Sequence, residues 1–140
     1  MSLSIVDAGL ETRVVDFGRP ASRRLGVPVG GAADRGLLSL GNSLMGNEPD
    51  AAALEFAVKG PTLRAECDVG FVVVGPPFAM HAQGRPLSVG QTFNLRGGEE
   101  LSIGGTPLGV RAYLCVAGGL EAPIVLKSRS SLTPLRKGDA

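Results

Sequence analysis

A glycine-rich segment ahead of a predicted helix is the first place in this sequence where residue types favour chemistry. Residues 26–34 are Gly-Val-Pro-Val-Gly-Gly-Ala-Ala-Asp, and three arginines, the first of them Arg19, precede them. Free N–H groups and the dipole at a helix start favour an anion, and arginines add positive charge. Gly30, Gly31 and Asp34 are therefore candidates for an anion site, although the residues alone favour a tight connection capped by Asp34.

A second polar segment, residues 127–131, has the sequence Lys-Ser-Arg-Ser-Ser. The hydroxyls of Ser128 and Ser130 and the guanidinium of Arg129 can hold a carboxylate or phosphate through charge-assisted hydrogen bonds. A solvated basic turn accounts for the same composition equally well. The segment thus leaves an anion site and a plain turn as alternatives.

The remaining polar residues supply acids but no complete hydrolytic, nucleotide or metal motif. Asp16 and Glu55 are potential proton acceptors or orienting groups. The ordinary alternatives are a strand-end aspartate paired with an arginine for Asp16 and a glutamate at a strand edge for Glu55. A Ser–His–Asp relay would need His81, the single histidine, and no serine stands in G-x-S-x-G. Residues 41–46 have the glycine spacing of a phosphate loop, but Asn47 stands where that motif requires a lysine. Two cysteines and one histidine do not make a zinc site.

The composition predicts one globular domain rich in short elements. The chain has 140 residues, 44% of them apolar, and a net charge of +1, which gives no reason to expect nucleic acid or an anionic membrane as a partner. Its 21 glycines and 10 prolines disfavour a helical bundle. The sequence shows no secretory leader and no apolar run near the ~20 residues of a membrane span. We therefore expect a cytoplasmic chain with reduced, buried cysteines.

Strand patterns dominate the elements that must position these groups. Turn residues recur at the spacing typical of a sandwich or barrel, and residues 110–116 alternate so that Arg111 and Tyr113 share one face. From Asp34, a predicted N-cap, apolar residues recur with helical spacing as far as a stop at Gly46 and Asn47. The other predicted strands are residues 3–6, 12–16, 54–59, 62–65, 71–74, 78–82, 91–95 and 101–103.

Taken together, these segments resemble the biotin-dependent carboxyltransferase family, also called allophanate hydrolase subunit 2. Its members include the C component of the bacterial ATP-dependent 5-oxoprolinase and a part of urea amidolyase. The resemblance runs in order through nearly the whole chain. The segments that carry it are residues 9–20, 25–28, 30–34, 42–47, 53–55, 60–63, 111–114, 116–119 and 128–131.

The resemblance implies a mainly β fold, a cyclophilin-like β-barrel with one principal helix, as a single domain over residues 1–140. It implies a role in complexes that open or carboxylate small amides, with a partner subunit of related fold, similar to the B component of 5-oxoprolinase or to allophanate hydrolase subunit 1. In the 5-oxoprolinase branch, ATP hydrolysis drives opening of the 5-oxoproline lactam to glutamate. The sequence has no biotin-attachment Met-Lys-Met and no nucleotide-binding motif, so ATP, and biotin in a carboxyltransferase, would bind elsewhere in the complex.

The resemblance also assigns site residues. Arg19 and Arg129 would hold the anion, Asp16 or Asp34 would orient it or accept a proton, and Ser128 and Ser130 would donate hydrogen bonds. No metal is expected. The assigned catalytic residues are Asp16, Asp34 and Arg129, and the assigned substrate-binding residues are Arg19, Gly30, Gly31, Asn42, Glu55, Ser128 and Ser130.

The sequence also departs from the family pattern. Val15 stands where the family usually has glutamine, Ala33 where it has methionine, and Lys127 where it has glycine. Family members are longer and carry a second barrel, so the chain corresponds to their N-terminal half. The alternative to an enzyme component is a non-catalytic module that binds and regulates a related protein.

Overall fold

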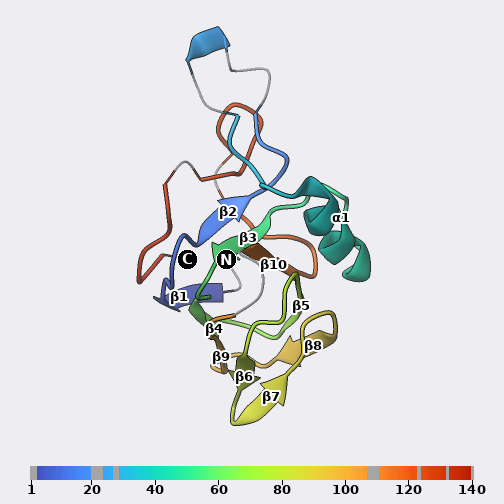
Figure 1. Ribbon diagram of the computed structural model, residues 1–140, viewed down its shortest axis with the longest axis vertical. Coiled ribbons are helices and arrows are strands. Elements are labelled where there is room, and N and C mark those ends of the chain that lie inside the picture. The colour runs from blue at the N-terminus through green and yellow to red at the C-terminus, as the bar shows by residue number, and fades with distance from the viewer. Residues whose placement is uncertain are drawn as a thin grey trace.

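Two five-stranded antiparallel sheets and one helix build the structure, a computed structural model that describes residues 3–19, 24–26, 29–106, 111–122, 124–131 and 133–139 (Figure 1). The first sheet has the strand order β1 (Leu3–Asp7), β4 (Thr62–Ala65), β9 (Glu100–Ile103), β6 (Met80–Ala82) and β7 (Arg85–Leu87). The second has the order β2 (Arg13–Val15), β3 (Ala53–Ala57), β10 (Arg111–Val116), β5 (Val69–Val74) and β8 (Thr92–Leu95). Helix α1 spans Arg35–Leu44.

Strand β10 shows how the sheets and the helix share one chain. Its even positions, such as Leu114, join the main core between the two sheets. Its odd positions Tyr113 and Cys115 join a second apolar cluster with Leu38 of α1. Because side chains alternate along a strand, both faces of β10 are buried, one under each layer. The helix packs against β10 and β5, and Figure 1 shows it to one side of this sheet.

The helix begins where the sequence predicts. The Asp34 carboxylate accepts a hydrogen bond from the Leu37 N–H at 2.9 Å and so satisfies one of the free donors of the first turn. Gly41 lets the helix approach β10 closely, because a Cβ there would lie 2.6 Å from the Cys115 sulfur. Gly46 adopts a positive φ of 72° just after the last turn, as a C-terminal stop does.

The end of the chain covers the outer edges of β2 and β1, the first strands of the two sheets. The Ser131 N–H donates to the carbonyl of Val14 in β2, and the Leu135 N–H donates to the carbonyl of Thr12, which directly precedes β2. Further on, Ile5 of β1 exchanges backbone hydrogen bonds with residues 138 and 139. Residues 128–131 and 133–139 therefore tie the two sheets together along one side and bring the serine hydroxyls close to β2.

The prediction of a mainly β fold with one helix is confirmed. Strand β7 was not predicted, because it is only three residues long and contains Pro86. The strand predicted over residues 110–116 is present from Arg111, and Val110 lies outside the described residues. Both cysteines are free, but the expectation that both are buried is wrong for Cys67, which is exposed. None of the described helices is long and apolar enough to cross a membrane.

Candidate functional site

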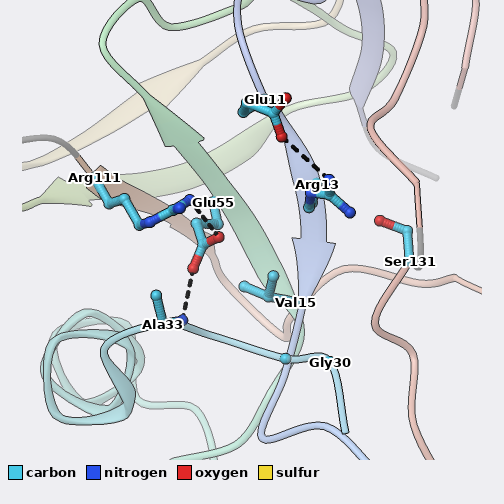
Figure 2. Close-up of a pocket in the computed structure, with 9 residues that line it drawn as sticks. Glu11, Arg13, Val15, Gly30, Ala33, Glu55, Arg111 and Ser131 are labelled. Atoms are coloured by element: carbon cyan, nitrogen blue, oxygen red, sulfur yellow. Dashed lines mark hydrogen bonds and ion pairs between the residues drawn. The ribbon is translucent and has the colours of Figure 1, made fainter. Parts of the chain in front are cut away.

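A cavity of about 360 Å³ opens beside β2, β3 and the start of β10 (Figure 2). The two polar segments predicted from the sequence both reach it, the first through Gly30 and Gly31 and the second through Ser131. Two arginines, two glutamates and a serine give the cavity its polar character. The lining residues are Glu11, Arg13, Val15, Gly30, Gly31, Ala33, Glu55, Arg111 and Ser131.

Glu55 is the buried acid of this cavity, and only 3% of its surface is exposed. Its Oε2 accepts hydrogen bonds from the Ala33 N–H at 2.8 Å and the Tyr113 hydroxyl at 2.7 Å. Its Oε1 pairs with the Arg111 guanidinium at 3.2 Å. Figure 2 shows the carboxylate between Arg111 and the loop that carries Ala33. Three hydrogen bonds hold the carboxylate in place, so Glu55 serves as an anchor for the groups around it.

Two guanidiniums lie on either side of Glu55. Sheet register places Arg13 of β2 directly opposite Glu55, while Arg111 begins β10 opposite Ala57. Their side chains are 29% and 42% exposed, so both contact solvent and the sheet. Arg13 pairs with Glu11 at 3.1 Å. Arg111 uses one nitrogen of its fork on Glu55, and a guanidinium fork can engage a second carboxylate through its other N–H groups.

Asp16 forms a different arrangement, called here the Asp16 cluster (Asp16, Gly18, Ser128, Arg129 and Ser130). The carboxylate accepts from the hydroxyls of Ser128 at 2.6 Å and Ser130 at 2.7 Å. It also accepts from the backbone N–H groups of Gly18 and Arg129, each at 2.8 Å. Burial alone would raise the pKa of Asp16, but these hydrogen bonds outweigh it, and the pKa is lowered. The hydroxyls predicted to hold a substrate anion thus hold an aspartate of the chain itself.

The two arginines predicted to hold the anion bind backbone carbonyls. Arg19 is buried, and it donates to the carbonyls of Val125 at 3.1 Å and Ser130 at 2.7 Å. The Arg129 guanidinium donates to the carbonyl of Ala122. Neither arginine lines the cavity. Their substrate roles stay predictions, and the contacts shown give both of them a part in holding the C-terminal segment.

The last two predicted site residues, Asn42 and Asp34, stabilise the ends of α1. Asn42 is fully buried and donates to the carbonyls of Pro49 and Ala51 at 3.0 and 2.9 Å. Asp34 caps the helix with its carboxylate, and its N–H donates to the Tyr113 hydroxyl at 2.9 Å. Within the described residues, no cluster of three His, Cys, Asp or Glu side chains offers a metal site.

The site assignments missed Arg111, Arg13 and Tyr113. The alternation of residues 110–116 did place Arg111 and Tyr113 on one face, and this was the available signal. What the sequence could not show is that β10 and β3 are neighbours, since Tyr113 and Glu55 are 58 positions apart. Only the antiparallel register brings them opposite each other.

The fold and cavity define a mainly β domain with a small cavity lined by charged side chains. Residues 25–140 match the family model described as "Carboxyltransferase domain, subdomain A and B". The chain belongs to this carboxyltransferase-domain family, and the resemblance predicted from the sequence is confirmed.

Named relatives and solved structures agree with this family. The chain is 33% identical to the C component of 5-oxoprolinase from Haemophilus influenzae over 129 residues, which cover 92% of the chain and 42% of that protein. It is 30% identical to the urea amidolyase of Saccharomyces cerevisiae over 133 residues, which cover 94% of the chain and 7% of that protein. The chain thus spans less than half the length of these relatives.

Two solved structures superpose on almost the whole chain. The crystal structure of TTHA0988 matches with a TM-score of 0.92 and 37% identity, covering 100% of this chain and 55% of that one. The urea amidolyase of K. lactis matches with a TM-score of 0.92 and 29% identity, covering 98% of this chain and 9% of that one. By their names, the 5-oxoprolinase component and the urea amidolyases are amide-processing enzymes or parts of them. This chain is similar to one portion of each.

Proposed function

We propose that this chain supplies a substrate-anion site to an ATP-dependent amidohydrolase complex of the 5-oxoprolinase type. In this proposal the chain corresponds to the N-terminal part of the C component and acts with a partner subunit of related fold. The similarity to the 5-oxoprolinase C component over 92% of the chain supports the class of enzyme. The observation that carries the proposal is the cavity in which Arg111 is anchored by buried Glu55, opposite the glycine loop.

The cavity suits a small molecule that carries both a carboxylate and an amide. The free N–H groups of the Arg111 fork bind the carboxylate, and Arg13 adds positive charge from the opposite side. Glu11 and the backbone of Gly30 and Gly31 lie at the same cavity and offer polar contacts to the amide. 5-Oxoproline has both groups on one five-membered ring. The nucleotide binds elsewhere in the complex, because the chain has no phosphate-loop motif.

The test is 5-oxoproline-dependent ATP hydrolysis by the chain reconstituted with its companion subunits. Arg111→Ala is expected to lower kcat/KM about 100-fold, because a charge-assisted contact to the substrate carboxylate is lost. Arg64→Ala is the matched control, since Arg64 also pairs with a glutamate, Glu100 at 2.7 Å, but on the exposed face of the other sheet. The control is expected to keep wild-type activity.

Two outcomes would overturn the proposal. Wild-type kcat/KM in Arg111→Ala would remove the cavity from the reaction. Stimulation by urea in place of 5-oxoproline would assign the chain to the urea amidolyase branch, which the 30% identity to yeast urea amidolyase keeps as the second candidate.

A further inference from the structure

Tyr113 is a fully buried tyrosine whose hydroxyl has two partners beside the cavity. The hydroxyl accepts a hydrogen bond from the Asp34 N–H at 2.9 Å and donates one to Glu55 Oε2 at 2.7 Å. The ring packs in the apolar cluster between β10 and α1. A phenylalanine would fill the same space, so the ring alone gives no reason for the hydroxyl. The hydroxyl joins strand β3 to the start of the helix.

We propose that Tyr113 is a positioning residue for the anion site. Its hydroxyl fixes Glu55 and the loop of residues 29–34 relative to each other, so that Arg111 contacts the carboxylate of a ligand while the loop backbone contacts the amide of the same ligand. This inference rests on the proposed function, because that function supplies the ligand that the fixed geometry would bind.

The two oxygens of Glu55 have different partners. Oε2 takes the hydrogen bonds from the Tyr113 hydroxyl and the Ala33 N–H, and Oε1 takes the one from Arg111. Because Oε2 is held from two sides, the carboxylate has one fixed rotation. That rotation presents Oε1 to Arg111 and so fixes the position of the guanidinium at the cavity wall.

The loop of residues 29–34 is held at both ends and presents its middle to the cavity. At the end farther from the helix, the Arg19 N–H donates to the Val29 carbonyl at 2.7 Å, and nearer the helix the Ala32 N–H donates to the Asp16 carbonyl at 2.9 Å. Gly31 packs directly on Gly18, where a Cβ would lie 2.6 Å from the Gly18 nitrogen. The last two residues of the loop, Ala33 and Asp34, are held by Glu55 and by the Tyr113 hydroxyl, so the hydroxyl completes the anchor next to the helix.

The Tyr113 hydroxyl keeps its proton at every working pH. Burial raises its pKa above the usual range, and the adjacent Glu55 carboxylate raises it further, because a phenolate would be desolvated and next to another negative charge. The hydroxyl is therefore a permanent donor to Glu55. Its removal leaves the Asp34 N–H without its acceptor and Oε2 with one donor fewer.

The experiment measures 5-oxoproline binding to the full chain by NMR titration of backbone amides, with the melting temperature of each variant measured alongside. Tyr113→Phe is expected to weaken binding about tenfold, which corresponds to a loss of about 1.4 kcal/mol of binding free energy. Cys115→Ala is the matched control: it removes a side chain from the same face of β10 and the same apolar cluster, and within the described residues the Cys115 thiol makes no hydrogen bond. It is expected to lower the melting temperature and to keep affinity within twofold.

Further variants separate this inference from the proposed function. If Tyr113→Phe does not fold, Glu55→Gln replaces it. Glutamine keeps the shape of Glu55, but one of its two oxygens becomes an NH2 group, so it cannot accept from Arg111, the Tyr113 hydroxyl and the Ala33 N–H together. The same tenfold loss is expected. Arg111→Ala tests the site itself and is expected to abolish measurable binding. Wild-type affinity in Tyr113→Phe or Glu55→Gln, with binding lost in Arg111→Ala, would overturn the positioning role and leave the site in place. No saturable shifts in the wild-type chain, or wild-type affinity in Arg111→Ala, would overturn both.

Discussion

Two carboxylates of this chain, Asp16 and Glu55, each accept several hydrogen bonds, but the groups that donate those bonds differ. Asp16 is surrounded by four donors, and all of them belong to the turn at Gly18 or to residues 128–130. Glu55 has three donors, and one of them is the half-exposed guanidinium of Arg111 at a cavity. A carboxylate enclosed by the chain stabilises the fold, whereas a carboxylate that anchors a half-exposed cation at a cavity is, in our proposal, part of a ligand site.

The comparison also separates the two predicted polar segments by role. Residues 29–34 contribute backbone to the cavity, whereas Ser128 and Ser130 turn toward Asp16 and hold the chain end on β2. Ser131 is the member of the second segment that reaches the cavity. The Asp16 cluster thus brings the cavity wall into place without forming it.

The largest expected effect is the loss of stability in Asp16→Ala. The substitution leaves two backbone N–H groups and two hydroxyls without their acceptor, and we expect the free energy of unfolding to fall by about 3 kcal/mol. Urea denaturation followed by circular dichroism measures it. A change below about 0.5 kcal/mol, the size of an ordinary surface substitution, would show that the Asp16 cluster does not contribute to the stability of the fold.

A smaller effect is the pH dependence that the same residue produces. Hydrogen bonds lower the pKa of Asp16 in the folded chain below its unfolded value of about 3.9, so its contribution is present above that pH and is lost as the pH falls through the folded pKa. We expect the stability difference between the wild type and Asp16→Asn to be constant near neutral pH and to shrink below about pH 4. A difference that stays constant down to about pH 2.5 would contradict the lowered pKa.

The smallest expected effect is a gain in stability at the turn beside the Asp16 cluster. Lys127 has a φ of 67°, a left-handed conformation that favours glycine. We expect Lys127→Gly to raise the free energy of unfolding by about 0.5 kcal/mol, because the relief of strain exceeds the added freedom of the unfolded chain. A loss of stability in thermal unfolding would show that the lysine side chain matters more than the backbone conformation.

Local features of the fold could be predicted from the sequence, and long-range contacts could not. The helix and its Asp34 cap follow from neighbouring residues, and the predicted strand over residues 62–65 matches β4. The contacts that build the cavity and its supports join distant positions: Tyr113 meets Glu55 across 58 positions, and Asp16 meets Ser128 across 112. Hydroxyls beside an arginine indicate an anion site equally well whether the anion is a ligand or an aspartate of the chain. Only the tertiary structure distinguishes the two.

The most direct test of this account is a crystal structure of the chain grown with 5-oxoproline. The central claim is that the cavity at Glu55, and not the Asp16 cluster, receives the anion. We expect the ligand carboxylate within hydrogen-bond distance of the Arg111 guanidinium, with the ring against the backbone of Gly30 and Gly31. A ligand bound to Arg129 and the hydroxyls of Ser128 and Ser130, with those groups released from Asp16, would contradict it.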